Sequence, residues 1–219
     1  MKLSSRLLAI ANYIDCKDKI VDVGCDHGYL DIYLALNKKN KMIIASDISP
    51  LVIKSTRENI SKYNLDNKIK TYCTSGIENI HEEYNTIVLS GLGAHTIINI
   101  LKKDSKAQKL IIQSNNHWDL IRENLIKLNY SLRKEKLIYE NKKLYSIMVF
   151  TKEEGKLTKK EKLVGLYNQD NVDEYKIWIN INTNILKSIP RKHLFKRLKY
   201  QKQIYYLNKY LSKENGFIC

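Results

Sequence analysis

The chain has 219 residues, 43% of them hydrophobic, and carries a formal net charge of +15 at pH 7. This length allows one domain with a sizeable core and a smaller appended domain, and the basic charge favours an acidic partner such as nucleic acid. No apolar run approaches the roughly 20 residues that cross a membrane, and the N-terminal segment lacks a cleavage-site pattern, so we expect a cytoplasmic protein with no membrane partner.

Cysteine usage argues against two further classes of protein. A disulfide framework or a zinc site requires cysteines at paired spacings. The four cysteines of this chain are scattered and form no C-x-x-C pair, and they are Cys16, Cys25, Cys73 and Cys219. We therefore expect reduced thiols and no bound metal.

The first 150 residues predict an α/β sheet domain. A helix is expected over 3–13, with Ser4 and Ser5 as caps. Short apolar runs follow, with helix-like segments between most of them, at 19–24, 42–47, 69–73, 86–91 and 109–114. This alternation predicts parallel strands joined by crossover helices. The segment 132–150 then predicts two strands about a polar turn at 140–143, so the parallel sheet closes with an antiparallel hairpin.

From about Thr151 the pattern becomes helical and more basic. Residues 151–219 hold 15 Lys and Arg against 7 Asp and Glu. Two helix faces are expected on either side of Ser188-Ile189-Pro190, one with Trp178, Ile181, Ile185 and Ile189, the other with Leu194, Leu198, Tyr205 and Leu211. We therefore predict a sheet domain over 1–151 and a basic helical hairpin over 152–219.

The basic residues after Pro190 allow two interpretations. Lysines on a helix usually have simply solvated side chains, which is the simpler explanation for any one of them. As a cluster interleaved with His193 and tyrosines, they could equally form a phosphate-binding surface. The candidate RNA-binding residues are Arg191, Lys192, Lys196, Arg197 and Lys199.

The segment VDVGCDHGYL, residues 21–30, predicts a binding loop. A strand that ends in Asp22-x-Gly24 and leads through a small-residue turn into a helix brings backbone close to a nucleotide-like ligand. A dinucleotide-binding loop would place glycines where this chain has Asp26 and Tyr29. An anionic Asp26 disfavours a pyrophosphate and tolerates a sulfonium.

Three later loops extend this site. Asp47 follows the second strand, where an acidic side chain can bind both ribose hydroxyls, and residues 75–77 and 90–93 follow the third and fourth. Ordinary strand-to-helix turns are the alternative, but four loops at one sheet edge agree. The expected cofactor-binding residues are Asp22, Gly24, Cys25, Asp26, His27, Gly28, Asp47, Ile48, Ser75, Gly76, Ile77, Gly91, Leu92 and Gly93.

Four segments, LSSRLLAIANYI, VDVGCDHGYL, LSGLGA and IIQSN, followed by the basic tail, resemble the bacterial tRNA adenine-22 N1-methyltransferase family. The resemblance implies a Rossmann-like class I methyltransferase domain, a C-terminal coiled coil, and methyl transfer from S-adenosylmethionine to N1 of an adenine in the D-arm region of tRNA. The chain departs from the family where Gly-Met-Gly-Gly becomes Gly91-Leu92-Gly93-Ala94 and where Gln-Pro-Asn becomes Gln113-Ser114-Asn115.

The chemistry of the loops is compatible with a ring nitrogen as acceptor. Residues 90–94 lack the Asn/Asp-Pro-Pro-aromatic motif that holds an exocyclic amine, whereas N1 has a free lone pair and mainly needs positioning. A carboxylate beside the acceptor would stabilise the developing positive charge or accept a proton. Asp26 is the first catalytic candidate, His27 the second, and Tyr29 could stack on the base. Each has a structural alternative: a turn contact for Asp26, a structural hydrogen bond for His27, and helix packing for Tyr29.

Three other functions remain open. A small-molecule or protein methyltransferase would share the loops without needing a basic tail. A methyltransferase of another RNA, such as ribosomal RNA, satisfies every physical argument. A non-catalytic RNA-binding protein would explain the charge but not Asp22, Gly24 and Asp47. Because N1 lies on the Watson–Crick edge, a tRNA target must be unpaired before transfer, and the tail would grip the tRNA meanwhile.

Overall fold

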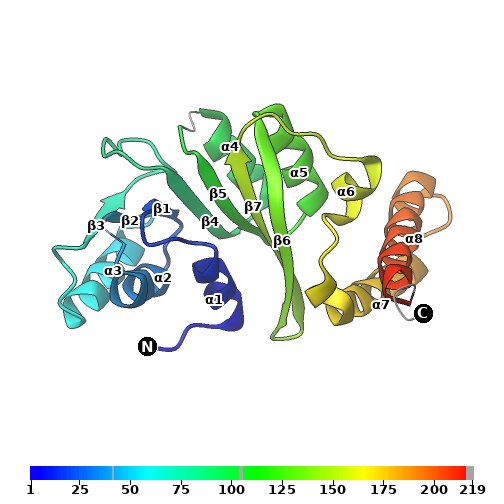
Figure 1. Ribbon diagram of the computed structural model, residues 1–219, viewed down its shortest axis with the longest axis horizontal. Coiled ribbons are helices and arrows are strands. Elements are labelled where there is room, and N and C mark those ends of the chain that lie inside the picture. Colours follow the sequence, from blue (N-terminus) through cyan, green and yellow to red (C-terminus); the bar gives the residue numbers. More distant parts are fainter. Residues whose placement is uncertain (41, 104–105, 216–219) are drawn as a thin grey trace.

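The computed structural model describes residues 1–40, 42–103 and 106–215, and its centre is a mixed β-sheet (Figure 1). In these ranges seven strands form one sheet in the order β3-β2-β1-β4-β5-β7-β6. The first five strands are parallel, and β7 is antiparallel to both β5 and β6. Their bounds are β1 Lys19–Val23, β2 Met42–Asp47, β3 Ile69–Cys73, β4 Thr86–Leu92, β5 Lys109–Ser114, β6 Tyr130–Glu140 and β7 Lys143–Lys152. The predicted parallel strands and closing hairpin are confirmed.

The strand order fixes where a ligand can bind. From β1 the chain proceeds outward to β2 and β3, then returns to place β4 on the other side of β1. The loops that leave β1 and β4 therefore diverge, and open parallel sheets bind their ligands in the crevice at such a switch point. In this chain that crevice lies beyond Val23 and Leu92.

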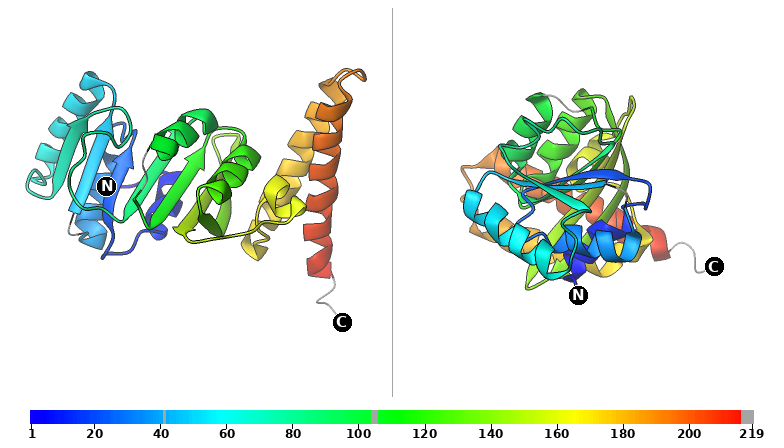
Figure 2. Two further views of the ribbon diagram at one scale, coloured as in Figure 1. Left: turned by 90° about the horizontal axis from the view of Figure 1, so that it is seen from above. Right: turned by 90° about the vertical axis from the view of Figure 1, so that its left-hand side faces the viewer.

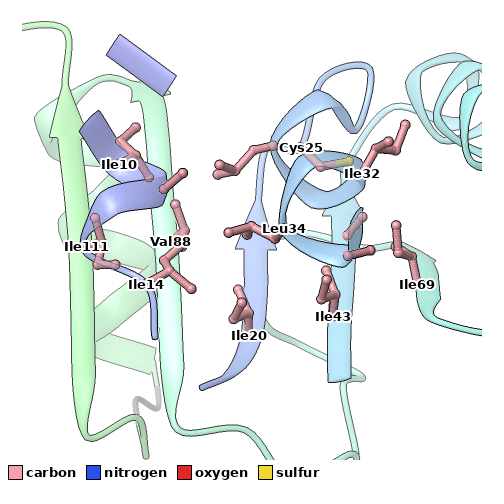
Figure 3. Close-up of a cluster of buried hydrophobic side chains, with 14 of the residues drawn as sticks. Ile10, Ile14, Ile20, Cys25, Ile32, Leu34, Ile43, Ile69, Val88 and Ile111 are labelled. Carbon is pink, nitrogen blue, oxygen red and sulfur yellow. The ribbon is translucent and has the colours of Figure 1, made fainter. Parts of the chain in front are cut away.

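Helices cover both faces of the sheet, which explains why its strands are apolar runs rather than alternating ones. One face is covered by α1 Ser5–Asn12, α2 Tyr29–Tyr33 with the π-helix η1 Leu34–Lys38, and α3 Pro50–Lys62. Figure 3 shows Ile10 and Ile14 over Val88 and Ile111 on this face. The other face is covered by α4 Ala94–Lys103 and α5 Trp118–Lys127. Ser4 caps α1 through a bond from the amide of Leu7, as predicted.

The C-terminal segment is helical and lies beyond the β6 edge of the sheet, at the opposite end of the molecule from β3 (Figures 1 and 2). It consists of α6 Lys159–Val164, the 3-10 helix η2 Gln169–Asn171, α7 Val172–Ser188 and α8 Leu194–Asn215. The last two form the predicted hairpin. Tyr175 and Trp178 of α7 pack with Leu207 and Tyr210 of α8 and with Leu137 of β6. The domain boundary at 151/152 stays a prediction.

The predicted apolar face of α8 is wrong at three of its four positions, because only Leu211 packs against the core of the helical segment. Leu194, Leu198 and Tyr205 are exposed, whereas Leu207 and Tyr210 are buried. Helical spacing identifies a face but does not say whether anything covers it. Here the first turn of α8 forms the outer end of the hairpin, and the helix contacts the rest of the protein from Lys199 onward (Figure 2).

The sequence predicts reduced cysteines, no metal site and no membrane-spanning helix, and the described part of the chain can be compared with these expectations. Cys16, Cys25 and Cys73 are free thiols, while Cys219 lies outside the described residues. In the described ranges no three His, Cys, Asp or Glu side chains are grouped to hold a metal ion. None of the helices there combines the length and apolar character that crossing a membrane requires.

A buried ion pair connects the sheet domain to the C-terminal segment. Arg122 of α5 and Glu135 of β6 are both almost fully buried and form two side-chain hydrogen bonds. Glu135 also accepts bonds from the Ser146 hydroxyl at 2.6 Å and the Leu166 amide at 3.2 Å. Arg122 Nη1 donates to the carbonyl of Lys162 at 3.1 Å. Each charge is thus multiply hydrogen-bonded, as burial requires.

Replacing Glu135 with Ala should be strongly destabilising because it leaves the Arg122 guanidinium buried and uncompensated. The expected loss is about 3–5 kcal/mol in the free energy of unfolding, measured by urea denaturation. Lys176→Ala breaks the exposed pair with Asp173 and serves as the control, with little expected change. Equal effects of the two substitutions would contradict the assigned role of the buried pair.

Candidate functional site

The loop after β1 is held in a left-handed backbone conformation at three positions. Gly24 has φ +78°, Asp26 φ +54° and Gly28 φ +72°. A Cβ at Gly24 would lie 3.4 Å from Leu92 Cδ2, and one at Gly28 would lie 2.8 Å from Thr56 Cγ2. Side chains at the two glycine positions would therefore be strained by φ, and at Gly28 also by collision. The two glycines let the loop that joins β1 to α2 turn sharply in the space between Leu92 of β4 and Thr56 of α3.

Two neighbouring pockets lie at the carboxyl edge of the sheet and share Gly24, Asp47 and Leu92. The first has a volume of about 280 Å³ and the second of about 240 Å³. The first pocket is lined by the loops after β2 and β3 and by α4, including Ile48, Ser75, Gly76, Ile77, Thr96, Asn99 and Ile100. The second is lined by α1, by the end of β1 and the loop after it, and by the end of β4, including Arg6, Asp22, Cys25, Asp26, His27, Tyr29, Ser90 and Gly91.

The structure thus brings together the loops that the sequence singled out. Of the expected cofactor-binding residues, all except Gly28 and Gly93 line one of the two pockets. Gly28 instead lies at the start of α2, where it packs on Thr56 of α3. The Gly93 carbonyl accepts a hydrogen bond from the Ile97 amide in the first turn of α4. A wider groove of about 880 Å³ runs along residues 77–85, where the ion pairs Lys19–Glu83 and Lys103–Glu78 balance its charge.

Asp22 places a buried carboxyl group in the second pocket. It is only 4% exposed, and burial raises its pKa to about 7, with further increases from the nearby Asp47 and Asp26 carboxylates. The Arg6 guanidinium opposes these effects. Burial and Asp22 also raise the pKa of the fully buried Asp31. A cationic group entering the pocket would stabilise the ionised form of Asp22.

Cys25 is buried beside this acidic group. Burial raises the pKa of its thiol, as do Asp31 and Asp22. The thiolate is the nucleophilic form of cysteine. Cys25 therefore contributes a small side chain to the pocket lining rather than a nucleophile.

Asp26, His27 and Tyr29 lie on the open side of the second pocket. The Asp26 side chain is 76% exposed, and its Oδ1 is 3.5 Å from His27 Nε2. His27 Nδ1 is 3.1 Å from the Ser55 hydroxyl, and its ring lies 5.6 Å from that of Tyr29. Tyr29 is 46% exposed. An incoming base could therefore meet the Asp26 carboxylate and the Tyr29 ring directly, whereas His27 already has a partner.

Arg6 is a site residue that the sequence did not reveal. Its Nη1 donates to the Ser90 hydroxyl and to Gln113 Oε1, both at 2.7 Å, and its guanidinium lies 5.6 Å from the centre of the Tyr145 ring. In the sequence, Ser90 lies 84 residues and Gln113 lies 107 residues from Arg6. No local pattern distinguishes Arg6 from any polar position of an amphipathic helix.

Gln113 and Asn115 hold the end of β4 from the other side. The buried Gln113 Oε1 accepts from the Gly91 amide at 3.1 Å, and its Nε2 donates to Asn115 Oδ1 at 3.3 Å. Asn115 Nδ2 donates to the Gly91 carbonyl at 2.5 Å. Both polar groups of the Gly91 backbone are therefore fixed by side chains, which positions the wall of the second pocket.

A methyltransferase-domain family model matches residues 3–148, which include both pockets. The tRNA (adenine(22)-N(1))-methyltransferase of Bacillus subtilis is 34% identical over 154 residues, and this alignment covers 68% of the chain and 65% of that enzyme.

Solved structures extend the similarity to nearly the whole chain. The structure of M. capricolum TrmK with S-adenosylhomocysteine matches with a TM-score of 0.82 and 29% identity, over 97% of this chain and 99% of that one. The B. subtilis m1A22 tRNA methyltransferase TrmK matches with a TM-score of 0.79 and 26% identity, over 96% and 99%. The chain therefore belongs to the methyltransferase-domain family, and over most of its length it is similar to bacterial tRNA (adenine(22)-N1)-methyltransferases.

Proposed function

We propose that the protein transfers a methyl group from S-adenosylmethionine to N1 of adenine 22 in tRNA. The observation that carries the proposal is the pair of adjoining pockets that share Gly24, Asp47 and Leu92. One pocket can hold the nucleoside part of a cofactor, and the other opens to a substrate. The activity named for the B. subtilis relative supports the choice of tRNA and of N1.

The residues of the two pockets fit S-adenosylmethionine, which supplies an electrophilic methyl group when bound. In the first pocket Ile48 and Ile77 offer apolar surface for an adenine, and Asp47 can accept bonds from ribose hydroxyls. In the second pocket the buried Asp22 offers a desolvated carboxyl group for the cationic amine. A small-molecule ligand site commonly combines apolar walls with a few such polar groups.

The protein's own side chains would orient the acceptor base. Tyr29 would stack on the adenine, which leaves the Asp26 carboxylate beside the ring where positive charge develops. Asp26 would stabilise that charge and accept the proton released from the exocyclic amine. Arg6, Gln113 and Asn115 would hold the loop at Gly91 so that the base and the methyl donor meet in line.

The helical hairpin would bind the tRNA backbone. Arg191, Lys192 and Lys196 are exposed and suited to phosphate contacts. The other two candidates have protein partners: Arg197 donates to main-chain carbonyls at the end of α7 and just after it, and Lys199 pairs with Asp119. We assign phosphate binding to the first three. A tRNA substrate also implies work in the cytoplasm.

Incubation with labelled S-adenosylmethionine and unmodified tRNA, followed by nucleoside analysis, tests the proposal. We expect label in 1-methyladenosine. Asp26→Asn, which keeps the side-chain shape and removes the charge, should lower the single-turnover rate more than the cofactor affinity. Label in 6-methyladenosine, or transfer to protein but not to RNA, would show that the proposed acceptor is wrong.

The raised pKa of Asp22 predicts a pH-dependent cofactor affinity. Below pH 7 Asp22 is protonated and loses its attraction for the cationic amine, so the affinity should rise as pH increases from about 5.5 to 7.5. The ligand-free protein should show the opposite trend in stability. In the folded protein the pKa of Asp22 is about 7, which exceeds the pKa of an Asp in the unfolded chain. The free energy of unfolding should therefore fall as pH rises from about 4 to about 7.

Calorimetric titrations of the wild type and Asp22→Asn at several pH values provide the measurement. Because Asp22 also raises the pKa of the neighbouring Asp31, the difference between the two proteins reports the charge of Asp22 together with its effect on Asp31. The variant should bind more weakly and with little pH dependence over this range. A variant with the wild-type pH profile would remove Asp22 from the account.

A further inference from the structure

The tip of the α7–α8 hairpin displays an exposed aromatic side chain. Phe195 is 92% exposed, the highest value among the large hydrophobic residues of the described ranges, and the adjacent Leu194 is 66% exposed. Both lie in the first turn of α8. Exposing a phenyl ring costs the free energy that its burial would contribute, so this position calls for a partner.

The tip is held in a defined conformation, and the exposure of Phe195 is part of that conformation. Arg197 Nη1 donates to the carbonyls of Leu186 at 3.0 Å and of Ile189 at 2.6 Å, which joins the start of α8 to the end of α7. The Ile189 side chain is buried beneath the turn, and the His193 amide donates to the Pro190 carbonyl at 3.1 Å. A preorganised tip loses little conformational entropy when it binds.

The charge around Phe195 selects an anionic partner. The sequence from Tyr175 to Lys213 contains ten Lys and Arg and no Asp or Glu. Arg191, Lys192 and Lys196, which flank Phe195, are all exposed. A second copy of the chain would bring the same cations face to face, which opposes self-association through this tip. A polyanion that also offers flat apolar surfaces is the complementary partner.

We propose that Phe195 is a stacking platform for an unpaired base of the RNA substrate, with Arg191, Lys192 and Lys196 binding the adjacent phosphates. Aromatic side chains interleaved with basic ones bind single-stranded nucleic acid in this way, since every base has a face on which a ring can stack. The inference rests on the proposed function for the identity of the RNA, but its binding chemistry is separate from the methyl-transfer pocket.

The hairpin is anchored to the first turn of α5, a few residues after β5. Lys199 Nζ lies 2.6 Å from Asp119 Oδ2. The rings of Trp118 and Trp178 lie 5.1 Å apart, edge to face, and the Trp118 indole donates to the Ser114 carbonyl at 2.9 Å. RNA bound at the tip would therefore be held in a fixed relation to the residues that position Gly91.

Binding of the full-length Phe195→Ala variant to two RNAs tests the inference: a short single strand and a blunt duplex of equal length. Loss of one stacked base should weaken single-strand binding about 5- to 140-fold, while duplex binding and the salt dependence of either affinity stay unchanged. Phe195→Trp should restore single-strand binding. Tyr63→Ala, which removes a partly exposed aromatic side chain from the end of α3, is the matched control and should change neither affinity.

Unchanged single-strand binding by Phe195→Ala, or equal losses on the single strand and the duplex, would overturn the stacking role. So would a selective loss of binding to anionic phospholipid vesicles or of self-association in sedimentation. S-adenosylmethionine affinity checks that the variant is folded. If the wild type fails to methylate tRNA, the proposed function fails, but the comparison of single strand and duplex still decides the role of Phe195.

Discussion

The carboxyl edge of the sheet depends on how the buried charge of Asp22 is balanced. Removing a carboxylate from water is unfavourable unless a cation or hydrogen bonds compensate. Here the nearby cation is Arg6, which reaches the edge from α1 and hydrogen-bonds to Ser90 and Gln113. The side chain that lowers the pKa of Asp22 therefore also holds the carboxyl ends of β4 and β5 in place. Because Arg6 contributes to both the charge balance and the pocket shape, a substitution that changes one should also change the other.

The C-terminal segment is coupled to this edge by two different contacts. The buried Arg122–Glu135 pair joins α5 and β6 to the segment that leads into the hairpin. The Trp118–Trp178 contact then ties α7 to the start of α5, and the Trp118 indole donates to the end of β5. Breaking a buried pair is costly because one charge is left uncompensated. The hairpin is thus built as a fixed arm beyond the β6 edge of the sheet, which suits a protein that must hold a large substrate while it acts on one base.

Much of the fold could be predicted from sequence because its signals are local. The five apolar runs became parallel strands, and the turn at 140–143 became the β6–β7 hairpin. The loops with Asp22, Gly24 and Asp47 could be placed together because parallel strands align their carboxyl ends. Arg6 and the Arg122–Glu135 pair could not, since their partners are brought near only by the tertiary fold. The α8 face was mispredicted for a related reason: spacing does not show where a helix leaves the body of the protein.

The most direct test of the central claim is reverse transcription through a tRNA transcript after incubation with the protein and S-adenosylmethionine. A methyl group on N1 blocks the Watson–Crick edge, so the account predicts a cofactor-dependent stop at adenine 22. A transcript with guanine at this position should show no such stop. Full-length products from a transcript that has nevertheless incorporated a labelled methyl group would contradict the claim, because the methyl would then lie away from N1.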